Sequence, residues 1–193
     1  HRLIRRQRQM CIRDSAKDDQ IVSMFRTSTR SSYGLVTSAG RLVLAHVVEL
    51  PKVSADGPLS VTGGVKAEEL LGMTENTDPI RGERVIAAID MPSTDDGGQL
   101  VPLALGTRNG VVKRWNRESP TTMDSWSVID LKDDDEVLAA AEARDEDRLV
   151  FVSTDSSLLT FEAKNVRPQG RTAGGMAGIR LAALGPGTAR ALS

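Results

Sequence analysis

Short apolar runs alternate with tight-turn residues along most of the chain. Three segments share one order: a β-rich run, a turn with a threonine, a second β-rich run and then a proline. They span residues 35–44, 104–114 and 151–161, and close at Pro51, Pro120 and Pro168. In each, the threonine precedes a Gly or Ser by three positions, in the pairs Thr37/Gly40, Thr107/Gly110 and Thr154/Ser157. The pattern predicts three related β-hairpins.

The turn residues support this prediction. Asn109-Gly110 is the strongest short hairpin signal, because both residues tolerate the positive φ that a type I′ turn demands. Residues 38–40 and 155–157 are weaker forms of the same turn chemistry.

Further strands are predicted after each hairpin. Less regular segments at 61–70, 121–131 and 169–181 each end on a strand, and short apolar strands follow at 83–89 and 136–141. The unit is therefore about four strands, repeated at intervals of 47 to 70 residues. We expect an all-β, propeller-like fold of about three four-stranded blades in an incomplete ring, over roughly 18–90, 91–143 and 144–193. A single β-sandwich is the alternative.

Composition narrows the classes of function. Aromatic residues make up only 3% of the chain, so the core must rest on Val, Leu, Ile and Ala. No apolar stretch approaches the roughly 18 residues of a membrane helix. One cysteine and two histidines exclude an internal disulfide and a zinc or triad constellation. The acidic run 133–136 is expected to be a solvated turn, and Trp115 and Trp126 are expected to pack between blades.

The first 15 residues differ from the rest. They hold five arginines and one acid, which would suit a disordered basic tail, a nucleic-acid arm or a transit peptide. We favour a fourth interpretation, non-native sequence from translated adapter read-through. Without this tail the chain is mildly acidic, so any contact with nucleic acid must come from a local basic band.

Three runs carry a resemblance to a known family. Residues 34–41, GLVTSAGR, with 48–51, VELP, are similar to a first-blade turn T-x-x-G-R and the x-E-L-P that follows it. Residues 106–114, GTRNGVVKR, resemble the hairpin T-R-x-G-V-V-K-R/K. Residues 166–181, VRPQGRTAGGMAGIRL, match V-R-P-M-G-R-x-A-x-G-V-x-G-I-x-L almost throughout. These motifs belong to the C-terminal domain of the A subunits of bacterial type IIA DNA topoisomerases, gyrase and topoisomerase IV. The resemblance covers about residues 18–193.

The resemblance implies a β-pinwheel that binds duplex DNA along a basic perimeter, bends it and presents a segment for strand passage. It implies no catalytic residue and no cofactor in this part; the ATP, the magnesium and the catalytic tyrosine belong to other domains of an ATP-dependent isomerase. Tyr33 does not lie in the active-site motif and is expected to be structural. The implied partners are DNA, a second copy of the parent chain and its ATPase B subunit, in the cytoplasm and without a membrane.

Candidate DNA-binding residues lie on hairpin tips and on the glycine-rich run. Arginine and lysine suit this role because they neutralise phosphates without reading sequence. Glycines let backbone approach phosphate closely. The candidates are Arg41, Arg108, Lys113, Arg114, Lys164, Arg167, Gly170, Arg171, Gly174, Gly175 and Arg180.

Two questions stay open at this level. An intact QRRGG(K/R)G sequence upstream of Lys17 would favour gyrase over topoisomerase IV. A propeller-like protein-interaction module without a DNA role is the second hypothesis, and a free-standing enzyme is the third, because no nucleophile–base pair is evident.

Overall fold

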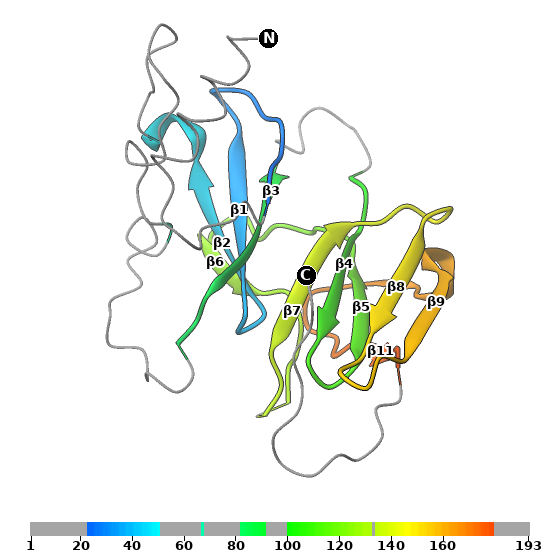
Figure 1. Cartoon of the computed structure of the whole chain (residues 1–193). Helices are drawn as coiled ribbons and strands as arrows, with labels where there is room; N and C mark the ends of the chain where they lie inside the picture. The colour runs from blue at the N-terminus through cyan, green and yellow to red at the C-terminus, as the bar shows by residue number, and fades with distance from the viewer. Residues whose placement is uncertain (1–22, 51–66, 68–81, 92–99, 133, 180–193) are drawn as a thin grey trace, which may run out of the picture.

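The protein is described by a computed structural model over residues 23–50, 67, 82–91, 100–132 and 134–179 (Figure 1). It is built from β-strands, with two 3-10 helices at Val47–Glu49 (η1) and Ala163–Asn165 (η4). The strands are β1 Ser32–Thr37, β2 Arg41–His46, β3 Val85–Met91, β4 Leu103–Thr107, β5 Val111–Trp115, β6 Ser125–Ser127, β7 Val137–Glu142, β8 Arg148–Val152, β9 Leu158–Glu162, β10 Pro168–Gln169 and β11 Met176–Ala177. Over these ranges, no helix has the length and apolar character to cross a membrane.

The described strands form three sheets, whose central hairpins β1-β2, β4-β5 and β8-β9 follow one another in chain order (Figure 1). The first sheet has the order β3-β1-β2-β6, and the second has the order β10-β5-β4-β7 with β11 also paired to β5. The third sheet is the hairpin β8-β9. The arrangement confirms the all-β, propeller-like fold, and a single sandwich of two facing sheets does not describe it.

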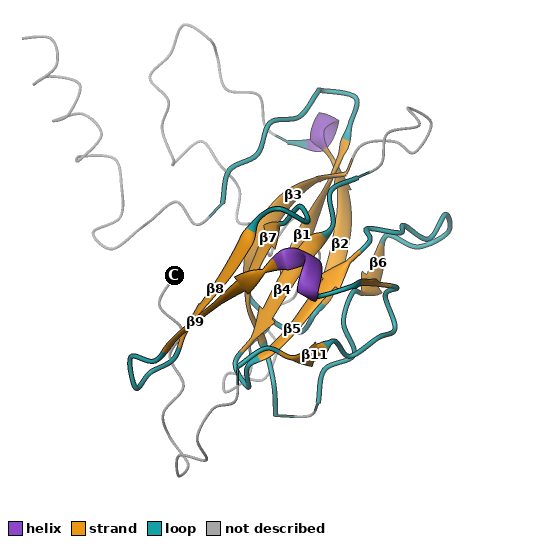
Figure 2. Ribbon diagram, turned by 90° about the vertical axis from the view of Figure 1, so that its right-hand side faces the viewer, coloured by secondary structure: helices purple, strands orange, loops and turns teal. Residues whose placement is uncertain are grey.

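Each of the first two sheets is completed by a strand from the next repeat. β6 follows the second hairpin in sequence, yet it pairs with β2 of the first, with Leu42 opposite Trp126. β11 follows the third hairpin and pairs with β5 of the second, with Val112 opposite Met176. Figure 2 shows β11 beside β5. The sheets are therefore not the contiguous segments 18–90 and 91–143 suggested by the repeats.

The hairpin turns differ in detail from the prediction. Among the described residues, only Arg117 and Ser156 combine a side chain with positive φ, so Asn109 does not and the type I′ turn is wrong. Gly110 (φ 81°) alone occupies the left-handed position, and its N–H donates to the Thr107 carbonyl at 3.1 Å. This is the three-residue loop in which a glycine ends a type I turn.

The third turn is shifted by one residue relative to the predicted Thr154/Ser157 pair. The N–H of Ser156 (φ 67°) donates to the Ser153 carbonyl at 3.0 Å. Ser153 therefore occupies the place of Thr37 and Thr107, and Ser156 occupies the place of the glycine. The threonine spacing gave the wrong position because Thr154 directly follows Ser153, the residue that is equivalent to Thr37 and Thr107.

The main core lies between the first two sheets. Trp115 of β5 and Trp126 of β6 meet edge to face, with ring centroids 6.5 Å apart and planes at 62°. Both are buried, which confirms that they pack between blades. The other buried members are aliphatic or Met, as the composition requires: Val36, Leu42, Ala87, Ile89, Met91, Leu103, Leu105, Val128, Ile129 and Val137.

A buried arginine that the sequence did not reveal joins these two sheets. Arg117 follows β5 with a φ of 59°, and its guanidinium donates to the Asp90 carbonyl of β3 and to the Glu142 carboxylate of β7. One cation thus satisfies groups from both sheets, which compensates for the cost of burying it.

The third hairpin packs against the second sheet, with small residues contributed by the sheet and aromatic residues contributed by the hairpin. A β-carbon on Gly106 of β4 would lie 3.3 Å from the Phe151 ring, which itself stacks on Phe161 with centroids 5.8 Å apart. The opposite face of the hairpin exposes Val150, Val152 and Leu158. The hairpin is therefore covered on one face only.

Replacing Leu103 by alanine should test the main core. Leu103 has no exposed surface, and truncation of such a leucine costs about 2–5 kcal/mol of unfolding free energy. Leu158→Ala, at a side chain that is 64% exposed, is the matched control and should change it by no more than about 0.5 kcal/mol. Urea unfolding followed by tryptophan fluorescence measures both; equal losses would contradict the assigned core.

Gly110→Ala should be destabilising for a backbone reason. The left-handed conformation costs a side chain about 1–2 kcal/mol, and the new β-carbon would lie 2.4 Å from the Ile179 carbonyl oxygen. Gly82→Ala is the control, because nothing lies within 4 Å of its β-carbon position. The expected result is a lower urea midpoint for Gly110→Ala alone. An unchanged midpoint would show that the turn conformation is different.

Candidate nucleic-acid interface

The predicted glycine-rich run forms a loop that leaves the edge of β5 and returns to it. β10 pairs with β5 at Gln169 opposite Trp115, and β11 pairs at Met176 opposite Val112. Residues 170–175 connect these two short strands without pairing to β5; we refer to them as the glycine-rich loop. Lys113 is the β5 residue between the two pairing sites, so its side chain is placed beneath this loop.

Lys113 is fully buried and is used inside the protein. Its Nζ donates to the carbonyl oxygens of Arg171 at 3.0 Å and Ala173 at 2.7 Å. Burial lowers the pKa of this ammonium group to about 8, although the nearby Asp130 carboxylate acts to raise it. The Ala173 carbonyl also accepts the N–H of Asp130 at 3.2 Å. The loop is therefore held from beneath by one side chain and one backbone amide.

Two arginines of this region present free guanidinium groups. Arg167 is exposed just before β10, and Arg171 is half-buried in the glycine-rich loop. Within the described part of the chain, neither guanidinium has a hydrogen bond or an ion pair. Both are available to an anionic ligand, as the sequence predicts.

Three other predicted cations are already paired with carboxylates. Arg41 makes a two-pronged contact with Glu83, at 2.9 Å from Nε and 2.6 Å from the terminal nitrogen. The guanidinium of Arg108 pairs with Glu136, and the ammonium of Lys164 pairs with Glu162. A phosphate would have to compete with these partners, so their contribution to binding is expected to be smaller.

Arg114 is placed where it cannot reach a ligand. Its side chain is 1% exposed, and one terminal nitrogen donates to the Ala163 carbonyl at 3.0 Å. The other donates to the Ala143 carbonyl at 2.9 Å and to Asp145 at 2.7 Å. It joins the second sheet to the third hairpin. The burial of Arg114 and Lys113 corrects their assignment as DNA contacts. The local sequence around them does not indicate that residues 163–178 cover them.

The glycines of the loop have unequal roles. Gly175 has a φ of 82°, and a β-carbon there would lie 2.7 Å from the Val112 carbonyl oxygen. A β-carbon on Gly174 would lie 3.2 Å from the Asp130 carbonyl, whereas at Gly170 the nearest atom is 3.8 Å away. Gly174 and Gly175 are therefore required for the path of the loop, and Gly170 is not. The predicted Arg180 lies outside the described residues.

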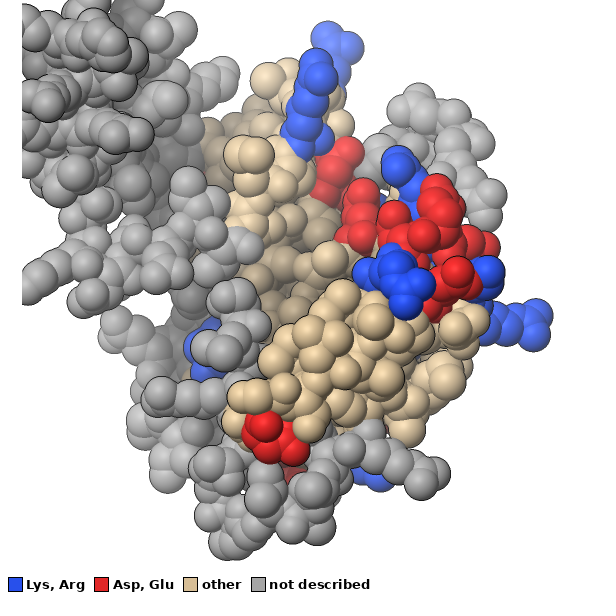
Figure 3. All heavy atoms as spheres, turned by 45° about the vertical axis from the view of Figure 1, so that its right-hand side comes forward, with Lys and Arg blue, Asp and Glu red and all other residues tan. Residues whose placement is uncertain are grey.

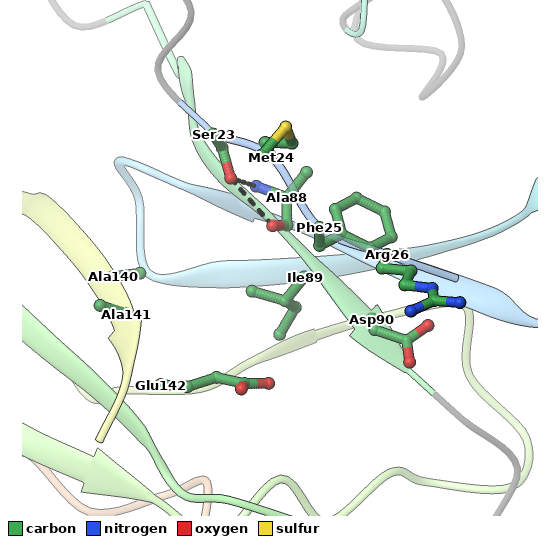
Figure 4. Close-up of a pocket in the computed structure, with 10 residues that line it drawn as sticks. All are labelled: Ser23, Met24, Phe25, Arg26, Ala88, Ile89, Asp90, Ala140, Ala141 and Glu142. Atoms are coloured by element: carbon green, nitrogen blue, oxygen red, sulfur yellow. Dashed lines mark hydrogen bonds between the residues drawn. The ribbon is translucent and has the colours of Figure 1, made fainter. Parts of the chain in front are cut away.

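The other candidate chemistry has structural explanations. Tyr33 is buried against Phe25, and burial, together with the charge of Glu49, raises the pKa of its hydroxyl. A cavity of about 580 Å³ lies between β3 and β7, and Figure 4 shows Arg26 and Asp90 in its lining. Over the described ranges, no group of three His, Cys, Asp or Glu side chains could hold a metal ion.

Charge is distributed locally and not as a continuous basic surface. Figure 3 brings the side of β8 and β9 forward, and there acidic and basic side chains are interleaved beside an uncharged area. On this face no unbroken basic band is present. The unpaired Arg167 and Arg171 lie in or beside the glycine-rich loop, within the segment that the sequence singles out.

Comparisons with known proteins point to one family. Residues 147–183 match the model of the DNA gyrase C-terminal domain, beta-propeller. Over 85% of its length the chain is 30% identical to the DNA gyrase A subunit of Mycolicibacterium smegmatis and 29% identical to that of Staphylococcus epidermidis. It spans 18% and 17% of the length of these relatives.

Solved structures give the same result for the fold. A C-terminal domain of DNA topoisomerase IV superposes with a TM-score of 0.69 at 22% identity, covering 93% of this chain and 53% of that one. A DNA gyrase A C-terminal domain superposes with a TM-score of 0.51 at 20% identity, covering 81% and 46%. Together with the exchanged strands and the motif at 166–179, these likenesses show a β-pinwheel fold and a similarity to the C-terminal domain of bacterial DNA gyrase A subunits.

Proposed function

We propose that this chain binds duplex DNA as an accessory domain of a type IIA topoisomerase A subunit. The observation that carries the proposal is the pair of unpaired arginines, Arg167 just before β10 and Arg171 in the glycine-rich loop, inside the segment that matches the gyrase family model. Guanidinium groups on a loop suit phosphate, because they neutralise it and make no demand on base sequence.

The proposed contact involves a small part of the protein surface and is made to the phosphate backbone of the DNA. Weaker attraction for DNA is expected from the paired cations Arg41, Arg108 and Lys164, because each would exchange a carboxylate for a phosphate. A mildly acidic body repels DNA elsewhere, so the duplex is oriented by where the free arginines lie.

In the parent enzyme, the domain bends the bound duplex and presents a segment for strand passage. Bending costs on the order of 1–6 kcal/mol, so several phosphate contacts must act together. Our proposal places the catalytic tyrosine, ATP and magnesium on other domains, and includes a dimeric parent chain paired with an ATPase B subunit in the cytoplasm. The support is the likeness to gyrase A subunits, of which this chain spans 18% of the length.

Duplex binding should depend strongly on salt. Each phosphate neutralised contributes about −0.9 to the slope of log K against log salt, so two free arginines predict a slope of roughly −2 or steeper. Fluorescence anisotropy with a short labelled duplex measures it, and energy transfer between labels at the two duplex ends reports bending. A salt-insensitive affinity, or binding no tighter than to a neutral polymer, would instead favour a protein-interaction module.

Removing either free arginine should weaken binding at low salt. Arg167→Ala and Arg171→Ala should each reduce the salt slope by about 1, because each loses one phosphate contact. Arg84→Ala is a charge-matched control: Arg84 is exposed, lies 3.5 Å from Glu136 and shares that carboxylate with Arg108. The control should bind nearly as well as the unaltered chain. If all three variants lost affinity equally, net charge and not the loop would govern binding.

A further inference from the structure

The direction of the peptide groups in the glycine-rich loop follows from Lys113. Its ammonium group draws the carbonyls of Arg171 and Ala173 inward, at 3.0 and 2.7 Å. In a trans peptide the N–H points opposite to the carbonyl of the same unit, and the described chain has no cis peptide. The N–H groups of Thr172 and Gly174 must therefore point outward, away from Lys113.

These two amides are free and accessible. Thr172 and Gly174 are both exposed, and neither N–H donates a hydrogen bond within the described residues. They are two residues apart on one turn of backbone, since the Ala173 N–H between them donates to the Gly170 carbonyl at 3.4 Å. Two outward amides of this kind can donate to a single anion.

The charge beneath the loop favours an anion above it. The Lys113 ammonium lies at the carbonyl ends of both peptide dipoles, so that their positive ends point away from it. Lysine burial is costly, as the pKa of about 8 indicates, and the two carbonyls are its compensation.

We propose that the glycine-rich loop is a preorganised phosphate-binding site, in which the Thr172 and Gly174 amides and the Arg171 guanidinium hold one phosphodiester while Lys113 fixes the loop from beneath. Lys113 is a positioning residue and does not touch the ligand. The proposal rests on the proposed function, but the site can be tested with inorganic phosphate alone.

Titration of the full ¹⁵N-labelled chain with inorganic phosphate should shift the amide signals of Thr172 and Gly174 more than other backbone amides. In Lys113→Met, a variant of similar length without the cation, these shifts should be lost. Gly82→Ala, outside the loop, is the control, because nothing lies within 4 Å of its β-carbon position, and it should behave like the unaltered chain. If phosphate shifts amides elsewhere and leaves these two unmoved, an adventitious ion only is bound and the proposal is wrong.

A pH profile tests the same site without a substitution. A nearby phosphate favours the ammonium form of Lys113, so binding must raise its pKa and weaken as the pH rises through the free value of about 8. Duplex affinity should therefore fall several-fold between pH 7 and pH 9. The other charged residues beside Lys113 are Asp130 and Arg171.

Matched variants test whether the fall in duplex affinity between pH 7 and pH 9 comes from Lys113. In Lys113→Arg the cation persists, and the step should vanish with affinity retained. In Lys113→Met the step should vanish with affinity lowered about tenfold, because the loop loses the cation that orients its amides. Cys11→Ser removes another group that titrates near this pH and should leave the step in place. A step that survives both Lys113 variants would overturn the proposal.

The two proposals fail in different ways. If the two amides respond to phosphate but the chain binds no duplex, the DNA-binding function is wrong and the anion site stands. If the duplex binds while neither amide responds to phosphate or to DNA, the site is wrong and the function stands.

Discussion

The unpaired edge of each hairpin is the constraint on which this structure depends. A two-stranded hairpin leaves a row of backbone N–H and carbonyl groups without partners on both sides. Here β2 and β5 are completed by β6 and β11, which arrive from the following repeat, and the N–H groups of Val128 and Gly178 continue the exchange by donating to Gly40 and Gly110 at 2.8 and 2.9 Å. Neighbouring blades therefore cannot separate without breaking main-chain pairing, and side-chain packing between them follows from it.

The same exchange creates the candidate site. Because β10 and β11 are only two residues each and meet β5 at separate places, the backbone between them has to leave the sheet. A loop formed in this way needs an internal support, and Lys113, projecting from β5 at the gap, supplies it. Arg114, the next residue, projects to the opposite face and supports the contact with the third hairpin. Two adjacent cations thus hold the two sides of one blade.

Much of the fold could be predicted from sequence because its signals are local. Gly40 and Gly110 mark turns that require left-handed backbone, and short β-rich apolar runs mark the strands of the hairpins. The predictions that failed concern residues whose partners are distant in sequence. Nothing near Lys113 or Arg114 indicates that residues 163–178 cover them, so the sequence pattern places both on the surface. Arg117 escapes prediction for the same reason: its partners Asp90 and Glu142 lie 27 and 25 positions away. The free arginines 167 and 171 could be found because they share a motif with the glycines that shape their loop.

The buried ammonium is the feature that packing alone does not explain. A methionine would fill the space of Lys113 without the desolvation that lowers its pKa, and replacing buried charges by apolar groups is often neutral or stabilising. A methionine could not, however, hold the carbonyl of Arg171, and the Ala173 carbonyl would keep only the Asp130 N–H, so the amides of Thr172 and Gly174 would be less firmly oriented. The energetic cost of the lysine is understandable if the direction of those amides matters. Cations in this domain then fall into two groups: buried ones such as Lys113 set the backbone, and exposed ones such as Arg167 leave their guanidinium groups open to solvent.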